Sequence, residues 1–504
     1  MLFNSPEFIF LFLPFAVVLH FALARWSMEA AVVGTTMSSL LFYAWWNPPF
    51  VLLPIVSIVA NFWLARRMVD ADQRNAKRLL VFGIVANVLV LCYYKYADFL
   101  LSIVDGHKAA APNVPLALSF TTFVQIAYLV HVHKRRKLPG FKRYALFVAF
   151  FPHLIAGPIV RWSNLGQQLS DPVRYRLDWD NIALGLTIFT FGLAKKLLIA
   201  DQLSPHVAGL FDAAARGDPI MGAAAWIVCF AFSAQIYFDF SGYSDMAVGL
   251  GLLFNFRLPI NFAAPLRAPN ISDVWRRWHI TLARLARDLI YVPLCLGHSG
   301  TLRRSLSLML TMVVIGVWHG AGWTFVLWGF YNGALLLIAQ AWQKLRGPGR
   351  RTAGRRLFGW LLTFTTFCIG AVLFRAADID TTWHLIKAMS GFGDAMTATV
   401  THPLDEWGVK NGFISETFVR TWFGTTWSMV GTVWTVAAVA IALFVPDTME
   451  IVNYREGDAQ SDWRRPLGNL AWRVSPIALA ITIVLFAAVF FRLGFVSEFL
   501  YYQF

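Results

Sequence analysis

Residues 309–329, MLTMVVIGVWHGAGWTFVLWG, contain no Asp, Glu, Lys or Arg, and one histidine, His319, stands between two apolar arms. Gly320 and Gly322 follow it and allow close approach of the backbone. The pattern predicts a helical hairpin inside a membrane. An ionisable side chain at that depth is costly and indicates a function by default. Imidazole suits proton transfer near neutral pH, although a purely structural histidine is the alternative.

The composition extends this membrane interpretation to the whole chain. Of its 504 residues, 58% are hydrophobic and 14% are charged, whereas a soluble protein has about 25% charged residues. The first apolar segment lacks a basic start and a cleavage site, so we interpret it as a span and not a signal peptide. We predict an all-α polytopic membrane protein with roughly 11 to 13 transmembrane helices. The candidate spans are residues 7–24, 30–46, 50–65, 79–101, 114–132, 182–200, 222–254, 306–317, 323–342, 358–374, 428–445 and 476–491.

The net charge of +15 is concentrated in short loops between the apolar segments. Residues 66–78, 134–143 and 344–356 are the most basic of these loops. Excess Lys and Arg is typical of cytoplasmic loops, so the charge reflects topology and not nucleic-acid binding. Attraction of anionic lipid, or of an anionic donor such as a CoA phosphate, is a further possibility. If the three basic loops are cytoplasmic, the N-terminus lies outside, and His319 lies within the bilayer, towards its outer side.

Two segments do not fit a simple helix count. Lys195 and Lys196 lie near the end of an outward-running span, so either that segment is re-entrant or the lysines line a polar cavity. Residues 144–160 contain helix-breaking Pro152 and Pro158, and broken backbone at membrane depth must be buried in protein or line a cavity. We expect a re-entrant element there. We see no internal repeat of the kind that many transporters contain.

A second group of chemically active residues lies in 234–282. Asp239 and Asp245 fall in an apolar span, where a carboxylate should face a cavity or pair with a cation. The candidate partners are Arg276, Arg277, Arg284 and Arg287. Structural ion pairs are the alternative for both aspartates.

The run Trp275–Arg276–Arg277–Trp278–His279 belongs to the same region. Trp275 and Trp278 are spaced to lie on one helical face, and interfacial anchoring is the simpler explanation of such a pair. His279 is either a second functional histidine or a satisfied interfacial one. The four cysteines have no zinc-type or disulfide-framework spacing, so we predict no metal. No nucleophile elbow or phosphate-binding loop is present.

Together these residues resemble the membrane-bound O-acyltransferase family, in its bacterial branch that acetylates alginate. The resemblance rests on segments in this order: MLFNS at 1–5, FPHLIAGPIVR at 151–161, FDFSGYSD at 238–245, WRRWH at 275–279 and WHG at 318–320. Residues 291–300, YVPLCLGHSG, and His131–Val132–His133 depart from the family pattern, which leaves the acceptor and the partner open.

The resemblance implies a helical membrane fold around a central tunnel. It also implies one membrane domain over 1–504, with N-terminal spans at 1–133, a catalytic core at 134–345 and C-terminal spans at 346–504 that include an exterior loop at about 376–425. The catalytic histidines would be His319 and His279. Trp318, Arg276, Trp278, Asp239 and Asp245 are candidates for the donor tunnel. Arg and Trp N–H groups near His279 are alternatives to it for stabilising the oxyanion.

The implied reaction moves an acetyl group from a cytoplasmic thioester, acetyl-CoA or an acyl carrier, towards hydroxyls of an exported polysaccharide. No permanently bound cofactor is expected. A periplasmic SGNH-type acetyltransferase or esterase partner and a bacterial inner-membrane location are implied as well. Tyr501, in the ending FLYYQF, is a possible acyl carrier or an aromatic anchor. Rival interpretations are a lipid or teichoic-acid acceptor, a transporter, and a non-catalytic scaffold of polysaccharide export.

Overall fold

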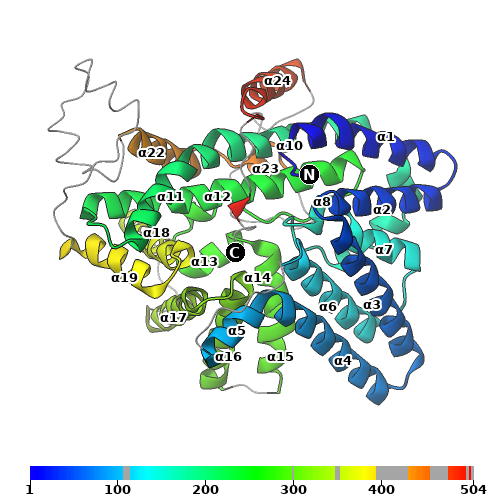
Figure 1. The fold of residues 1–504 in the computed structure, drawn as a ribbon, viewed down its shortest axis with the longest axis horizontal. Coiled ribbons are helices and arrows are strands. Elements are labelled where there is room, and N and C mark those ends of the chain that lie inside the picture. Colours follow the sequence, from blue (N-terminus) through cyan, green and yellow to red (C-terminus); the bar gives the residue numbers. More distant parts are fainter. Residues whose placement is uncertain are drawn as a thin grey trace. The chain divides into compact units, whose positions relative to one another are not determined.

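The computed structural model describes residues 1–105, 114–297, 300–346, 352–392, 429–454, 475–494 and 499–500. Every regular element within these ranges is a helix (Figure 1). Eight helices are long and apolar enough to cross a membrane: Pro48–Asp70, Gln73–Ile103, Trp179–Ala215, Gly222–Leu253, Thr301–His319, Trp323–Arg346, Ala353–Arg375 and Met429–Ile451. The prediction of an all-α polytopic membrane protein is confirmed.

The remaining predicted spans are also helical but less suited to crossing alone. Phe8–Ala24 and Pro476–Phe490 are shorter apolar helices. Helix α2 (Met28–Ala44) buries four hydroxyl side chains, Thr35, Thr36, Ser38 and Ser39. Helix α6 (Leu118–Arg135) buries Gln125. The number of membrane spans predicted from apolar content is therefore larger than the eight helices of the described residues that also meet the criteria of length and polarity.

The chain forms two compact units, of which unit 1 contains Met1–Ala194, Gly242–Asn261 and the part that begins at Thr448. Helices α3, α4 and α6 run side by side (Figure 1). Gly83 of α4 fits against Leu64 and Leu129 of the two neighbours. Besides α2 and α6, the helices of unit 1 are α1 (Leu13–Ala24), α3 (Leu52–Asp70), α4 (Gln73–Leu91), α5 (Ala97–Asp105), α7 (Phe141–Ala149), α8 (Phe151–Leu154), α9 (Trp162–Leu165), α10 (Trp179–Ala194), α23 (Thr448–Ile451) and α24 (Pro476–Phe490).

The segment predicted to be re-entrant is broken and buried. Helix α7 ends at Ala149, and α8 begins with Pro152 in its first turn, where proline is tolerated. Residues 155–160 are not helical, and all of them are buried. This is the protein-enclosed environment that broken backbone requires in a membrane protein.

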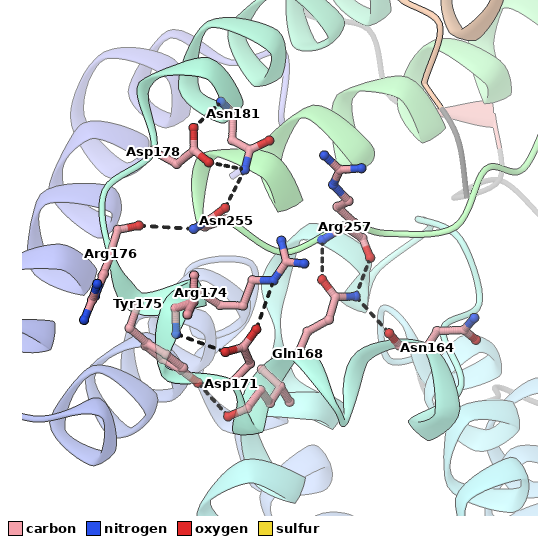
Figure 2. Close-up of polar contacts among 12 residues, drawn as sticks. Asn164, Gln168, Asp171, Arg174, Tyr175, Arg176, Asp178, Asn181, Asn255 and Arg257 are labelled. Atoms are coloured by element: carbon pink, nitrogen blue, oxygen red, sulfur yellow. Dashed lines mark hydrogen bonds and ion pairs between the residues drawn. The ribbon is translucent and has the colours of Figure 1, made fainter. Parts of the chain in front are cut away.

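A polar network in unit 1 links residues 164–181 to the chain that follows α12 (Figure 2). The Gln168 side chain accepts a hydrogen bond from Arg257 N at 2.8 Å and donates to Arg257 O at 2.9 Å. Asn255 has a left-handed backbone with φ of 62°. Its side chain accepts from Asn181 Nδ2 at 2.5 Å and donates to Arg176 O at 3.1 Å. These contacts fix the chain where α12 ends.

Unit 2 contains Lys195–Ser241 and Phe262–Asp447. A π-helix, Lys195–Ala200, leads into α11 (Asp201–Ala215), so the chain stays helical past the two lysines. Helix α12 (Gly222–Leu253) begins in this unit. The other helices of unit 2 are α13 (Ile271–Arg277), α14 (Ile280–Ala286), α15 (Val292–Cys295), α16 (Thr301–His319), α17 (Trp323–Arg346), α18 (Ala353–Arg375), α19 (Ile379–Lys387) and α22 (Met429–Phe444).

Candidate active site

The predicted hairpin is formed by α16 and α17, and His319 is the last residue of α16. The two helices touch through glycines. A methyl carbon added at Gly329 would lie 2.5 Å from Met312 O, and one added at Gly316 would meet Phe325 O. Small residues allow helix backbones to approach closely in membranes. The glycines therefore fix where His319 lies against α17.

Aromatic rings enclose His319, which is 4% exposed. Its ring centroid lies 5.3 Å from that of Trp328 and 5.1 Å from that of Phe374, both in edge-on geometry. The adjacent Trp318 ring is 4.9 Å away. These walls form an apolar environment, in which electrostatic interactions are stronger than in water.

His279 lies next to His319, with 6.5 Å between the two ring centroids. It is 1% exposed and packs edge-on against Phe240 at 4.8 Å. Its backbone is left-handed, with φ of 42° and ψ of 51°, directly before α14 begins. Such a conformation costs roughly 1–3 kcal/mol for a residue other than glycine and is concentrated at functional sites. The structure thus brings together the two histidines that the sequence singled out.

The burial of His279 predicts a pH-dependent stability. Burial lowers the pKa of His279 from 6.5 to about 3. Between those values the unfolded chain binds a proton that the folded chain does not, so the free energy of unfolding should fall as the pH drops from about 6.5 towards 3. Chemical unfolding in lipid nanodiscs at several pH values measures this. The His279→Gln variant should show a shallower slope, and equal slopes would contradict the prediction.

Asp239 pairs with a lysine that the sequence analysis did not propose as its partner. Its carboxylate lies 2.6 Å from Lys196 Nζ, which also lies 2.8 Å from Asp201. All three residues belong to unit 2, and the Asp239 side chain is 2% exposed. The ion pair explains how Lys196 is accommodated in an outward-running helix, because a buried charge must be paired. Two of the arginines, Arg277 and Arg287, pair instead with Asp273 and Asp288.

This ion pair predicts a large stability difference. Asp239→Asn should lower the free energy of unfolding by about 1.5–3 kcal/mol, because it removes one charge-assisted hydrogen bond of a buried ammonium that keeps Asp201 at 2.8 Å. Asp218→Asn is the matched control, since the Asp218–Arg216 pair has a similar distance of 2.7 Å but is exposed. The control should change stability by about 0–1 kcal/mol. Unfolding midpoints in nanodiscs measure both, and a small effect for Asp239→Asn would contradict the prediction.

The other residues predicted for the donor tunnel have different surroundings. Arg276 is exposed and pairs with Asp273 at 3.8 Å, so it does not neutralise Asp239. Trp278 is buried against Phe262 and Phe367 and is not an exposed interfacial anchor. Helix α13 ends at Arg277, and Trp278 is its C-cap, whose N–H still donates to Val274 O at 2.8 Å.

Asp245 lies in the α12 part that belongs to unit 1, and it is 4% exposed. Tyr501 and most of the predicted exterior loop lie outside the described residues. Sequence reasoning missed Trp328 and Phe374 as neighbours of His319, because no local pattern marks a contact between helices. The described residues hold no group of three His, Cys, Asp or Glu that fits a metal ion.

Comparison with known proteins identifies the family. The model of the membrane-bound O-acyltransferase family, MBOAT, matches residues 82–373, more than half of the chain. The chain belongs to the membrane-bound O-acyltransferase family. It is 38% identical over 425 residues to the peptidoglycan O-acetyltransferase of Helicobacter pylori, with 78% of this chain and 80% of the relative covered.

Two further relatives define the range of similarity. The probable alginate O-acetylase AlgI of Azotobacter vinelandii is 38% identical over 409 residues, covering 78% of this chain and 79% of the relative. The teichoic acid D-alanyltransferase of Bacillus subtilis is 23% identical over 319 residues, covering 60% and 80%. This MBOAT protein is thus a multi-pass membrane acyltransferase, which confirms the predicted family and enzyme class.

Proposed function

We propose that this MBOAT protein transfers an acetyl group from a cytoplasmic thioester to a hydroxyl of an exported cell-surface polysaccharide. The observation that carries the proposal is the pair of buried imidazoles, His279 and His319, whose ring centroids are 6.5 Å apart. A small reacting group between them can be within reach of both. The relatives named for peptidoglycan and alginate are more similar to this chain than the one named for D-alanyl transfer.

His319 is the proposed general base. A hydroxyl is a poor nucleophile at neutral pH, so a base must take its proton as it attacks. The hydroxyl oxygen bonds to the thioester carbonyl carbon, and its proton moves to the His319 imidazole. The C–S bond then breaks, and the thiolate takes the proton back from the imidazolium. The products are an O-acetyl ester and a thiol.

His279 is the proposed positioning partner of this base. Burial lowers its pKa to about 3, so it is neutral at pH 7. A neutral imidazole still offers one N–H donor and one acceptor nitrogen. The thioester, acetyl-CoA or an acyl carrier, is a substrate here, and the proposed reaction uses no permanently bound cofactor.

The acceptor is tested in cells of the native host. Deletion of the gene should remove ester-linked acetate from the exported polysaccharide, and the wild-type gene should restore it. Isotope-labelled acetyl groups in the cytoplasm should appear in that ester. Unchanged polysaccharide acetate together with loss of an acyl group from a lipid or teichoic-acid polymer would replace this acceptor with the rival one.

The proposed setting is the bacterial inner membrane, with a periplasmic SGNH-type subunit that completes the transfer. This proposal is supported by the family resemblance and by the outward-facing topology expected for His319. Co-purification from native membranes, followed by deletion of the co-purifying subunit, tests it. Unchanged acetylation after that deletion would contradict the need for such a partner.

A further inference from the structure

Three tryptophans of unit 2 differ in whether their indole N–H groups have a hydrogen-bond acceptor. Trp226 donates to Met389 O and Trp360 donates to Leu266 O, both at 2.9 Å. The Trp275 ring nitrogen is also buried, but among the described residues it has no hydrogen-bond partner. Buried tryptophan N–H groups usually find a partner. An unpartnered buried donor costs about 1–3 kcal/mol, so this one requires an explanation.

Trp275 lies near the histidine pair. Its ring contacts Trp328 with 5.8 Å between centroids, and Trp328 packs edge-on against His319 at 5.3 Å. Helix α13, which carries Trp275, packs on α17, which carries Trp328. The unpartnered N–H therefore belongs to the same aromatic cluster as the proposed base.

Two local contacts stabilise the seven-residue helix α13. The Asn270 side chain caps its start by accepting from Asp273 N at 2.9 Å. At its end, Arg277 pairs with Asp273 at 2.7 Å. These contacts keep the helix regular, and its packing on α17 positions the indole. Donors that are positioned before the reaction stabilise developing charge most effectively.

The chemistry of the ligand follows from the donor. Indole N–H donates and does not accept, so its partner must present an acceptor atom. The ring that Trp275 contacts, Trp328, is apolar, and the indole nitrogen itself is shielded from solvent. In the reaction proposed above, the strongest developing acceptor is the carbonyl oxygen of the thioester.

We propose that Trp275 Nε1–H donates a hydrogen bond to the thioester carbonyl oxygen, an inference that rests on the proposed acyl transfer. When the hydroxyl oxygen bonds to the carbonyl carbon, the carbonyl π electrons move to this oxygen and the N–H bond to it strengthens. When the C–S bond breaks, the electrons return and the carbonyl reforms. Trp275 is thus a catalytic residue that gives up no proton.

The experiment replaces the indole nitrogen without changing the ring shape. The full chain in lipid nanodiscs carries at position 275 either tryptophan or its sulfur analogue, benzothienylalanine, and the probes are acetyl-CoA as donor and the host's exported polysaccharide as hydroxyl acceptor. We expect kcat for thiol release to fall roughly 10²-fold, as for loss of one oxyanion donor, with little change in KM. Trp275→Phe should behave similarly where it folds. Cellular polysaccharide acetate is the second readout.

Trp360→Phe is the matched control, because it removes an indole N–H that already has a main-chain partner. It should lower the unfolding midpoint and leave kcat per folded molecule unchanged. A kcat within about threefold of wild type for the sulfur analogue would overturn the role of Trp275, since one lost oxyanion donor should cost far more. The proposed function is judged separately, by polysaccharide acetate in cells that carry the wild-type gene: its absence contradicts the acyl transfer and not Trp275 alone.

Discussion

Replacement of His319 by alanine is expected to abolish acetyl transfer, with a loss of about 10³-fold or more in rate. A general base alone contributes roughly 10²–10⁴-fold. The neighbouring His279 is a poor substitute as a base, because burial lowers its pKa to about 3. The measurement is ester-linked acetate on the exported polysaccharide, compared at matched levels of protein in the membrane.

The matched control for His319 is His384→Ala, a partly exposed histidine of the same unit that lies on α19. It should keep full acetylation. His319→Ala protein must also unfold at a wild-type midpoint, so that loss of acetate reports chemistry and not folding. Acetate retained in His319→Ala cells would favour a non-catalytic scaffold or a transporter and would withdraw the proposed mechanism.

The hairpin that carries His319 could be predicted because its pattern is local. Two apolar arms and a glycine-rich turn lie within one short stretch, and the structure places α16 and α17 at the expected residues. The structure of residues 275–279 was harder to predict from the local pattern. Its spacing suggested one helix, but the helix ends at Arg277 and His279 adopts a left-handed backbone that its residue type does not announce.

Contacts between segments that lie far apart in the chain could not be predicted from the sequence. The sequence showed that Lys196 does not suit an outward-running span, but nothing near it in the sequence identified Asp239 as its partner. Four arginines were also candidate partners for Asp239. The aromatic wall of His319 depends on Trp328 and Phe374, which come from two different helices. In an apolar sequence rich in aromatic residues, hydropathy cannot distinguish a ring that faces lipid from one that faces a histidine.

Substitution of Gly329 by alanine is expected to have the second largest effect. The added methyl carbon would lie 2.5 Å from Met312 O and 2.8 Å from Val313 Cα, and both are backbone atoms of α16 that cannot rotate away. The helices must separate, and His319 at the end of α16 moves with its helix. Because a displacement near 1 Å can cost about 10²-fold in rate, we expect acetylation to fall at least that far.

Gly333→Ala provides the control on the same helix. Its added carbon would meet Met309 Sδ at 2.7 Å, and that sulfur lies at the flexible part of a side chain that can turn aside. Acetylation and the unfolding midpoint should stay near wild type. Equal activity of Gly329→Ala and Gly333→Ala would mean that the hairpin tolerates separation, and the position of His319 would then have to be set by Trp328 and Phe374 rather than by helix contact.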